Sequence, residues 1–94
     1  MIKELGTKYG ARRFTLFSHS SIVIVFSIVY YFLLKPRDFN GGEGLKNYID
    51  YFYFTMVTHT SVGYGDISPK TKKARLLVTL HITIAFFLII SLWL

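Results

Sequence analysis

Two long stretches without a formal charge dominate this sequence of 94 residues. They cover residues 14–34 and 76–94, and neither contains Asp, Glu, Lys or Arg. At about 1.5 Å per residue, a helix over either stretch is roughly 30 Å long, which matches the hydrocarbon core of a bilayer. A secretory signal is the alternative for the first stretch, but the apolar region of a signal is only about 7–15 residues long. The pattern therefore predicts two transmembrane helices, the first over residues 14–34.

The composition indicates that this chain is surrounded by lipid. Hydrophobic residues make up 52% of it and charged residues 17%, and a soluble chain of this length could not bury so much apolar surface. The net charge of +6 flanks the apolar stretches and does not line one face, which argues against nucleic acid as a partner. The absence of cysteine excludes disulfides and a CxxC zinc site. With no nucleophile–base pair or carboxylate dyad, we expect neither an enzyme nor a bound cofactor.

The segment before the first span, residues 1–13, is basic and is interrupted by two glycines. Ile2, Leu5 and Tyr9 fall roughly on one side of a helix, so an interfacial helix in the headgroup plane is one interpretation. A frayed basic tail is the other, because glycine weakens a helix.

The region between the spans begins with a loop, or turret, over residues 35–47. Within it, residues 39–44 are expected to form a flexible turn with nothing to pack against. Asn47 can then cap a short aromatic helix over residues 48–59, with Asp50 favourably placed in its first turn. This helix is too short to cross a bilayer, so it predicts either a re-entrant segment or a patch on the surface.

The second long helix is expected over residues 69–94. Ser68 would be its N-cap and Pro69 its first helical residue. The basic residues that follow would extend into the headgroups.

Glycines alternate in the loop over residues 60–66, at Gly63 and Gly65. Glycine accepts a positive φ, and a backbone of alternating handedness can direct successive carbonyls to one side. Non-helical backbone at membrane depth must be buried in protein or line a water-filled path. A row of carbonyls is a ligand set for a hard monovalent cation, so this loop predicts a cation pore.

The residues around this loop also resemble a known family. The pattern Thr58-x-x-Ser61-x-Gly63-Tyr64-Gly65-Asp66 is similar to the signature of potassium channels with two transmembrane helices and a pore loop. Nearly the whole chain resembles the miniature potassium channels that large algal viruses encode. The residues that carry this second likeness are Tyr53-Phe54, His59, Pro69-Lys70-Thr71, His81-Ile82 and Phe86-Phe87.

The resemblance implies an all-α membrane protein in which two transmembrane helices flank a re-entrant pore helix and a selectivity-filter loop. Four copies would assemble around an axis, K⁺ would be the permeant ion, and Ba²⁺ would block the pore. The implied ion ligands are the Ser61 hydroxyl and the backbone carbonyls of Ser61, Val62, Gly63 and Tyr64. The residues implied to support the filter are Thr58, Thr60, Gly65, Asp66 and Tyr53. The candidates for a constriction at the inner mouth are Phe87 and Trp93.

Two positions depart from the family pattern. Ser61 stands where the family usually has threonine; it keeps the hydroxyl but lacks the methyl group that stiffens χ1. Val57 stands where some potassium channels have a glutamate that contacts the aspartate of the motif. Asp66 therefore needs another partner, and we predict that the Tyr53 hydroxyl is that partner.

Two groups of residues allow more than one interpretation. The aromatic residues of the short helix could form an interfacial belt or a cuff that braces the filter. His19, His59 and His81 have no helical i,i+4 spacing, so we expect neutral histidines that hydrogen-bond between helices in preference to a metal site.

The expected function is passive, K⁺-selective conduction across a membrane. The alternatives are a non-selective cation pore and a small viroporin-like or holin-like membrane protein without selectivity. Basic residues are more numerous between the spans than before them, and the positive-inside rule alone would place the loop in the cytoplasm. The resemblance implies the opposite orientation, with both termini cytoplasmic, and a host or virion membrane as the location.

Overall fold

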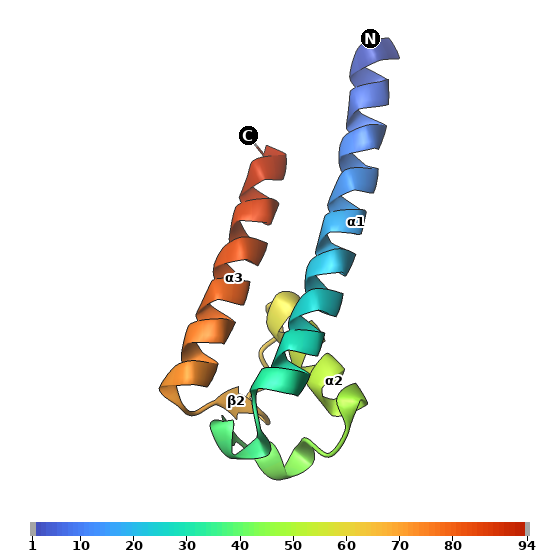
Figure 1. Ribbon diagram of the computed structural model, residues 1–94. Helices are drawn as coiled ribbons and strands as arrows, with labels where there is room; N and C mark the ends of the chain where they lie inside the picture. Colours follow the sequence, from blue (N-terminus) through green and yellow to red (C-terminus); the bar gives the residue numbers. More distant parts are fainter. Residues whose placement is uncertain (1, 94) are drawn as a thin grey trace.

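Two long helices and one short helix make up most of the chain in this computed structural model, which describes the backbone of residues 2–93 and the side chains of residues 13–91. Helix α1 (Ile2–Leu33) and helix α3 (Lys72–Trp93) run side by side, and α2 (Tyr48–His59) packs between them at one end (Figure 1). The connecting loops lie at this end, and both termini lie at the other. The molecule measures 53 Å along its length and 21 Å in the other two directions, enough to cross a bilayer of about 40–45 Å with its headgroups.

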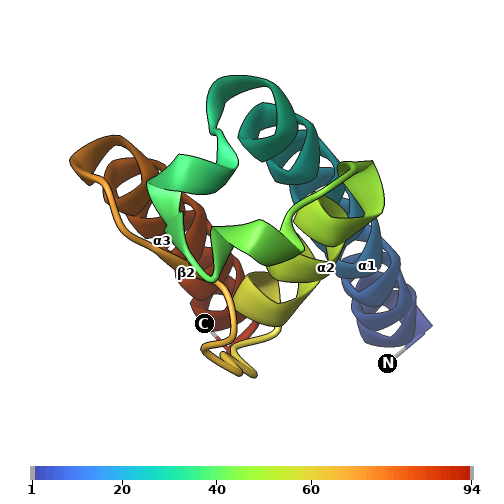
Figure 2. The same cartoon turned by 90° about the horizontal axis from the view of Figure 1, so that it is seen from below.

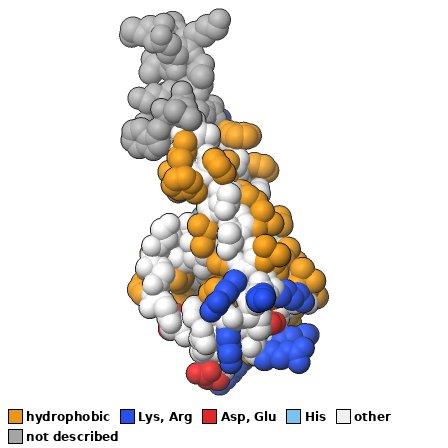
Figure 3. Space-filling view, turned by 90° about the vertical axis from the view of Figure 1, so that its left-hand side faces the viewer, with side chains coloured by type: hydrophobic (Ala, Val, Ile, Leu, Met, Phe, Trp, Pro, Cys, Tyr) orange, Lys and Arg blue, Asp and Glu red, His pale blue; other side chains and the backbone are white. Residues whose placement is uncertain are grey.

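Both predicted transmembrane helices are present. Arg13–Leu33 within α1 and Lys72–Ser91 within α3 are long and apolar enough to cross a membrane. Hydrophobic side chains run along the molecule, while Lys and Arg gather near the end that carries the loops (Figure 3). The boundary expected at residue 13 does not interrupt the helix, because α1 is continuous from Ile2. Extending an existing helix adds one hydrogen bond per residue without the cost of a new nucleus, so the basic segment continues the span.

Short elements close the loop end of the molecule. Single 3₁₀ turns cover Pro36–Asp38 and Gly42–Gly44. Strand β1 (Phe39–Asn40) pairs antiparallel with β2 (Ser68–Pro69), with Phe39 opposite Pro69. This two-residue ladder joins the segment after α1 to the segment before α3.

The predicted start of the second long helix is wrong. Ser68 and Pro69 lie in β2, and α3 begins at Lys72. Thr71 provides the cap, since its hydroxyl accepts a hydrogen bond from the Ala74 N–H at 3.3 Å.

Asp38 explains this later start. Its backbone carbonyl accepts the N–H groups of Lys70 and Thr71 at 2.8 and 3.3 Å. Its carboxylate accepts the Thr71 hydroxyl at 2.8 Å and the Lys35 N–H at 2.8 Å. These bonds hold the segment before α3 extended against the end of α1, so the local capping signal at Ser68 is overridden.

The loop after α1 contributes to the hydrophobic core, contrary to the expectation of a flexible turn. Phe39 is buried and its ring meets the rings of Phe54 and Tyr51 edge-on, at 5.0 and 6.3 Å between centroids. Tyr30 of α1 also packs edge-on against Phe54, at 5.6 Å between centroids. The other members of this cluster are Phe26, Leu34, Leu45, Ala74 and Val78. The core therefore lies at the loop end, where it holds α2 between the two spans.

The Asp38 carboxylate has a lowered pKa, chiefly because the Lys35 N–H donates to it. The Thr71 hydroxyl and the nearby positive charges lower it further, and burial opposes them. A carboxyl with a lower pKa in the folded state stabilises the fold fully above its unfolded pKa of about 3.9. That contribution is lost as the pH falls through the folded value.

Replacement of this carboxylate should therefore destabilise the fold in a pH-dependent way. We expect Asp38→Asn to lower the free energy of unfolding by about 1 kcal/mol at neutral pH, because a neutral amide accepts weaker hydrogen bonds than a carboxylate does. The difference from the parent should shrink as the pH falls below about 4, where the carboxyl group of the unfolded chain takes up a proton, and it should vanish below the lower pKa of the folded state. Circular dichroism of the detergent-solubilised protein during denaturation measures both effects. Glu43→Gln is the control, because Glu43 is exposed and its carboxylate makes no hydrogen bond to the described residues; an equal effect in this control would contradict the role of Asp38.

Candidate functional site: the pore loop

Helix α2 covers residues 48–59, the range expected from the sequence, and it begins at a well-satisfied N-terminus. Asn47 is the N-cap residue. The Asp50 carboxylate accepts the backbone N–H groups of Lys46 and Asn47 at 2.9 and 3.0 Å, and these two bonds lower its pKa. The negative charge also complements the positive end of the helix dipole. The opposite end of α2 is electronegative and leads directly into the loop that carries the motif.

The backbone of this loop alternates in handedness. Gly63 and Gly65 have φ values of 58° and 82°, as the glycine spacing predicts. Ser61 also has a positive φ, 65°, which the sequence did not indicate because serine has a Cβ. The loop leaves α2 through two backbone bonds, from the Ser61 N–H to the Thr58 carbonyl at 3.2 Å and from the Gly63 N–H to the Val57 carbonyl at 3.3 Å.

The conformation of Ser61 gives a reason for the departure from threonine at this position. A left-handed conformation costs an L-residue about 1–2 kcal/mol, and a β-branched side chain makes that conformation an outlier. Serine carries the same hydroxyl on an unbranched Cβ. Position 61 thus retains its oxygen with less backbone strain than threonine would create.

The loop lies at one side of the molecule and is not enclosed by the three helices (Figure 2). Val62 is 52% exposed and Tyr64 is 70% exposed. No atom lies within 4 Å of a Cβ built on Gly63 or Gly65, apart from their chain neighbours. This part of the loop is therefore not covered by any other described part of the same chain.

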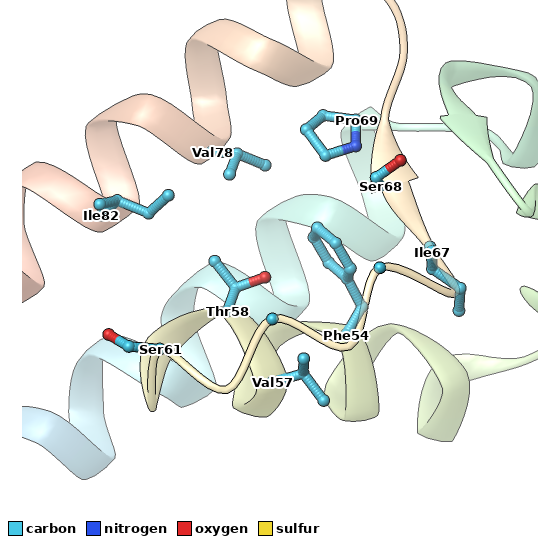
Figure 4. Close-up of a pocket in the computed structure, with 11 residues that line it drawn as sticks. Phe54, Val57, Thr58, Ser61, Ile67, Ser68, Pro69, Val78 and Ile82 are labelled. Carbon is cyan, nitrogen blue, oxygen red and sulfur yellow. The ribbon is translucent and has the colours of Figure 1, made fainter.

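A cavity of about 430 Å³ lies behind the loop (Figure 4). Val78 and Ile82 line it from α3, and Phe54, Val57 and Thr58 line it from α2. Ser61, Gly63 and Gly65 line it from the loop, so the cavity separates the loop from α3 at this level.

Two contacts hold the outer end of the loop. The Tyr53 hydroxyl donates to Asp66 Oδ2 at 2.7 Å, which is the bond predicted from the absence of an acid at Val57. Gly41, with φ of 74°, approaches the backbone of Asp66 so closely that a Cβ on Gly41 would overlap the Asp66 carbonyl. Asp66 is thus held by α2 through a side chain and by the turret through direct backbone contact.

The aromatic residues of α2 divide between the two roles considered from the sequence. Tyr51 and Phe54 belong to the buried core, and Tyr53 reaches the outer end of the loop. Tyr48 is partly exposed, and its hydroxyl lies 2.6 Å from the Ser27 hydroxyl of α1. Tyr51 and Phe54 therefore hold α2 in the core, and Tyr53 is the one that bonds to the loop.

The three histidines meet across the helices, as expected. His19 Nδ1 lies 2.7 Å from His59 Nε2, and His59 Nδ1 lies 3.0 Å from His81 Nε2. They form a line and do not surround a common point. Among the described residues, no group of three or more His, Cys, Asp or Glu side chains could hold a metal ion.

The remaining predicted residues lie in different places. Thr58 lines the cavity, and the Thr60 hydroxyl donates to the Met56 carbonyl at 2.7 Å, which ties Thr60 to the last turn of α2. Phe87 is exposed on α3 with its ring beside that of Phe86. The side chain of Trp93 lies outside the described residues.

Loss of the bond between Tyr53 and Asp66 should loosen the outer end of the loop. For the tetrameric channel that the family resemblance implies, we expect Tyr53→Phe to shorten the mean open time in planar bilayers and to lower the temperature at which the assembly dissociates. Tyr31→Phe is the matched control, because the Tyr31 hydroxyl makes no hydrogen bond to the described residues and only its ring packs against neighbours. Parental behaviour of Tyr53→Phe in both measurements would show that the bond does not support the loop.

Comparison with known proteins identifies the family. Residues 18–93 match the ion channel family. The potassium channel protein of Paramecium bursaria Chlorella virus 1 is 34% identical over 92 residues, which cover 92% of this chain and 96% of that protein. A hyperpolarization-activated voltage-gated potassium channel of Methanocaldococcus jannaschii is 46% identical over 37 residues, which cover 39% of this chain and 18% of that protein.

A solved structure agrees with these sequence relatives. The crystal structure of a voltage-gated K⁺ channel pore module, in a closed state in lipid membranes, superposes with a TM-score of 0.62. It is 30% identical in sequence, and the match covers 85% of this chain and 78% of that one. The chain therefore belongs to the ion channel family, as an integral membrane protein with two spans around a pore loop.

Proposed function

We propose that this protein is a potassium-selective channel that conducts K⁺ passively and has no enzymatic role. The observation that carries the proposal is the alternation of positive φ at Ser61, Gly63 and Gly65 directly after a short helix that packs between the two spans. Such a backbone can present successive carbonyl oxygens to one side. Carbonyl oxygens replace the hydration shell of K⁺ in channels of this kind.

The functional unit is a homotetramer. A single loop offers one carbonyl per layer, so a complete oxygen cage needs several copies around an axis, and cyclic closure is the usual solution. The exposed face of the loop supports this assembly, since one protomer leaves it uncovered. The ion ligands in the tetramer are the Ser61 hydroxyl and the carbonyls of Ser61, Val62, Gly63 and Tyr64.

The orientation follows from the same proposal. The termini lie at the end opposite the loops (Figure 1). We place both termini in the cytoplasm and the turret outside, in the membrane of a host cell or virion. Phe87, exposed on α3, would then lie toward the cytoplasmic mouth, where its ring narrows the exit.

Selectivity tests this proposal directly. With K⁺ on one side of a planar bilayer and Na⁺ on the other, the current of the purified protein should reverse near the K⁺ equilibrium potential. Gly65→Ala should abolish this selectivity, because alanine is strained at a φ of 82°. Gly44→Ala is the control, since a Cβ there would meet only the Ile67 side chain at 3.8 Å. A parent protein equally permeable to Na⁺ and K⁺ would instead favour the non-selective pore.

Ba²⁺ block tests the proposed role of the Ser61 hydroxyl. Ba²⁺ is close to K⁺ in size but carries two charges, so it binds the same oxygens more firmly. Ser61→Ala removes one ligand per protomer and should shorten the Ba²⁺ dwell time about tenfold, as for a lost interaction of about 1.4 kcal/mol. Ser61→Thr keeps the hydroxyl and should not shorten the dwell time. Equal dwell times in the parent and Ser61→Ala would place the hydroxyl outside the pore.

A further inference from the structure

A tyrosine and three histidines form one continuous line of hydrogen bonds, here called the histidine chain. Its order is Tyr30, His81, His59, His19. The Tyr30 hydroxyl lies 2.8 Å from His81 Nδ1, and two bonds between imidazoles, at 3.0 and 2.7 Å, continue the line to His19. Tyr30 and His19 belong to α1, His59 to α2 and His81 to α3, so the line joins all three helices.

Burial determines the direction in which the bonds of this chain run. Tyr30 and His81 have no solvent exposure, and the Tyr30 hydroxyl has no other hydrogen-bond partner among the described residues. A buried O–H needs an acceptor, so Tyr30 donates to His81 Nδ1. A neutral imidazole has one donor and one acceptor nitrogen, so His81 must carry its proton on Nε2.

The same rule fixes the remaining two bonds. His81 Nε2–H donates to His59 Nδ1, and His59 Nε2–H donates to His19 Nδ1. The opposite direction would leave the proton of the buried Tyr30 hydroxyl without an acceptor. All three histidines are therefore neutral with the proton on Nε2, and His19 is the terminal acceptor.

His59 is the member of the chain that lies nearest to the filter. It is the last residue of α2, two positions before Ser61. Both of its ring nitrogens are bonded, one toward α1 and the other toward α3, so the ring cannot turn without breaking a bond. The backbone bonds from Ser61 to Thr58 and from Gly63 to Val57 start from this same turn of helix. A shift of the His59 ring would move the turn that supports the strained conformation of Ser61.

We propose that His19 is a positioning residue for the selectivity filter. Through its single acceptor atom, Nδ1, it holds the His59 ring, and the His59 ring holds the last turn of α2. Among the described residues, the His19 ring bonds to His59, and His19 acts on the loop as the end of this directed line of bonds. The inference rests on the filter assigned under the proposed function, but the direction of the chain can be tested without any current.

The tautomers are measured by nitrogen-15 NMR of the histidine-labelled channel in lipid bilayers at neutral pH. The expected result is the Nε2–H tautomer at His19, His59 and His81. An Nδ1–H tautomer at His59 or His81 would overturn the directed chain. This result stands whether or not the channel selects K⁺, so it separates a failure of this inference from a failure of the proposed function.

The positioning role is tested by replacing the acceptor and then restoring it. His19→Leu removes Nδ1 and should shorten the mean open time several-fold, while His19→Asn places an amide oxygen near the same point and should restore it to within about twofold. Ser20→Leu, the control on the same turn of α1, should leave the open time unchanged. Equal behaviour of His19→Leu and His19→Asn would overturn the role of the acceptor. If His19→Leu does not assemble, the test rests on His19→Asn alone. Parental open times together with the Nε2–H tautomer at His59 would then support the proposal. Shortened open times would overturn it.

Discussion

Backbone N–H and C=O groups within a bilayer have no water to bond with, and an irregular segment survives there only where protein or a water-filled path satisfies it. The loop after α2 is such a segment. Its first residues bond back to the last turn of α2, and its outer end is held through Asp66 by Tyr53 and by the close approach of Gly41. The rest of the molecule positions this loop, because the core at the loop end holds α2 between the two long helices that cross the membrane.

The features predicted from the sequence are those that depend on local patterns. The two spans follow from the length of the uncharged stretches, and α2 follows from its cap and its short aromatic run. The alternation at Gly63 and Gly65 follows from their spacing, and the bond from Tyr53 to Asp66 follows from the valine at position 57 together with the family resemblance.

The features that were missed depend on contacts between distant parts of the chain. Ser68 and Pro69 carry a good helix-start signal, but the bonds of Asp38 to the segment before α3 override it. Phe39 has no packing partner nearby in sequence and finds its partners in α2. The order and direction of the histidine chain depend on how three helices pack, and no spacing along the sequence contains that information. The positive φ of Ser61 was missed because glycine is the usual signal for that conformation.

The two spans of one protomer leave large apolar side chains uncovered. Phe17 of α1 and Leu76 of α3 are each 72% exposed. Lipid covers such faces in a membrane protein, so the stability of the fold cannot be separated from insertion into the bilayer. The core at the loop end differs in this respect, since its members all belong to a single chain and are buried within it.

The alternating φ values also have a stereochemical consequence. At positions 61, 63 and 65 the backbone has the handedness that D-amino acids adopt without strain, whereas an L-residue has its Cβ on the unfavourable side. A chain made only of L-residues can build this backbone from achiral glycine, as at Gly63 and Gly65, or by accepting strain, as at Ser61. The backbone of the pore loop therefore alternates between conformations that suit L-residues and conformations that suit D-residues, although the chain contains only L-residues and glycine. A chemically synthesised chain with D-serine at position 61 would carry the same backbone without that strain, although its side chain would leave Cα in the mirror-image direction.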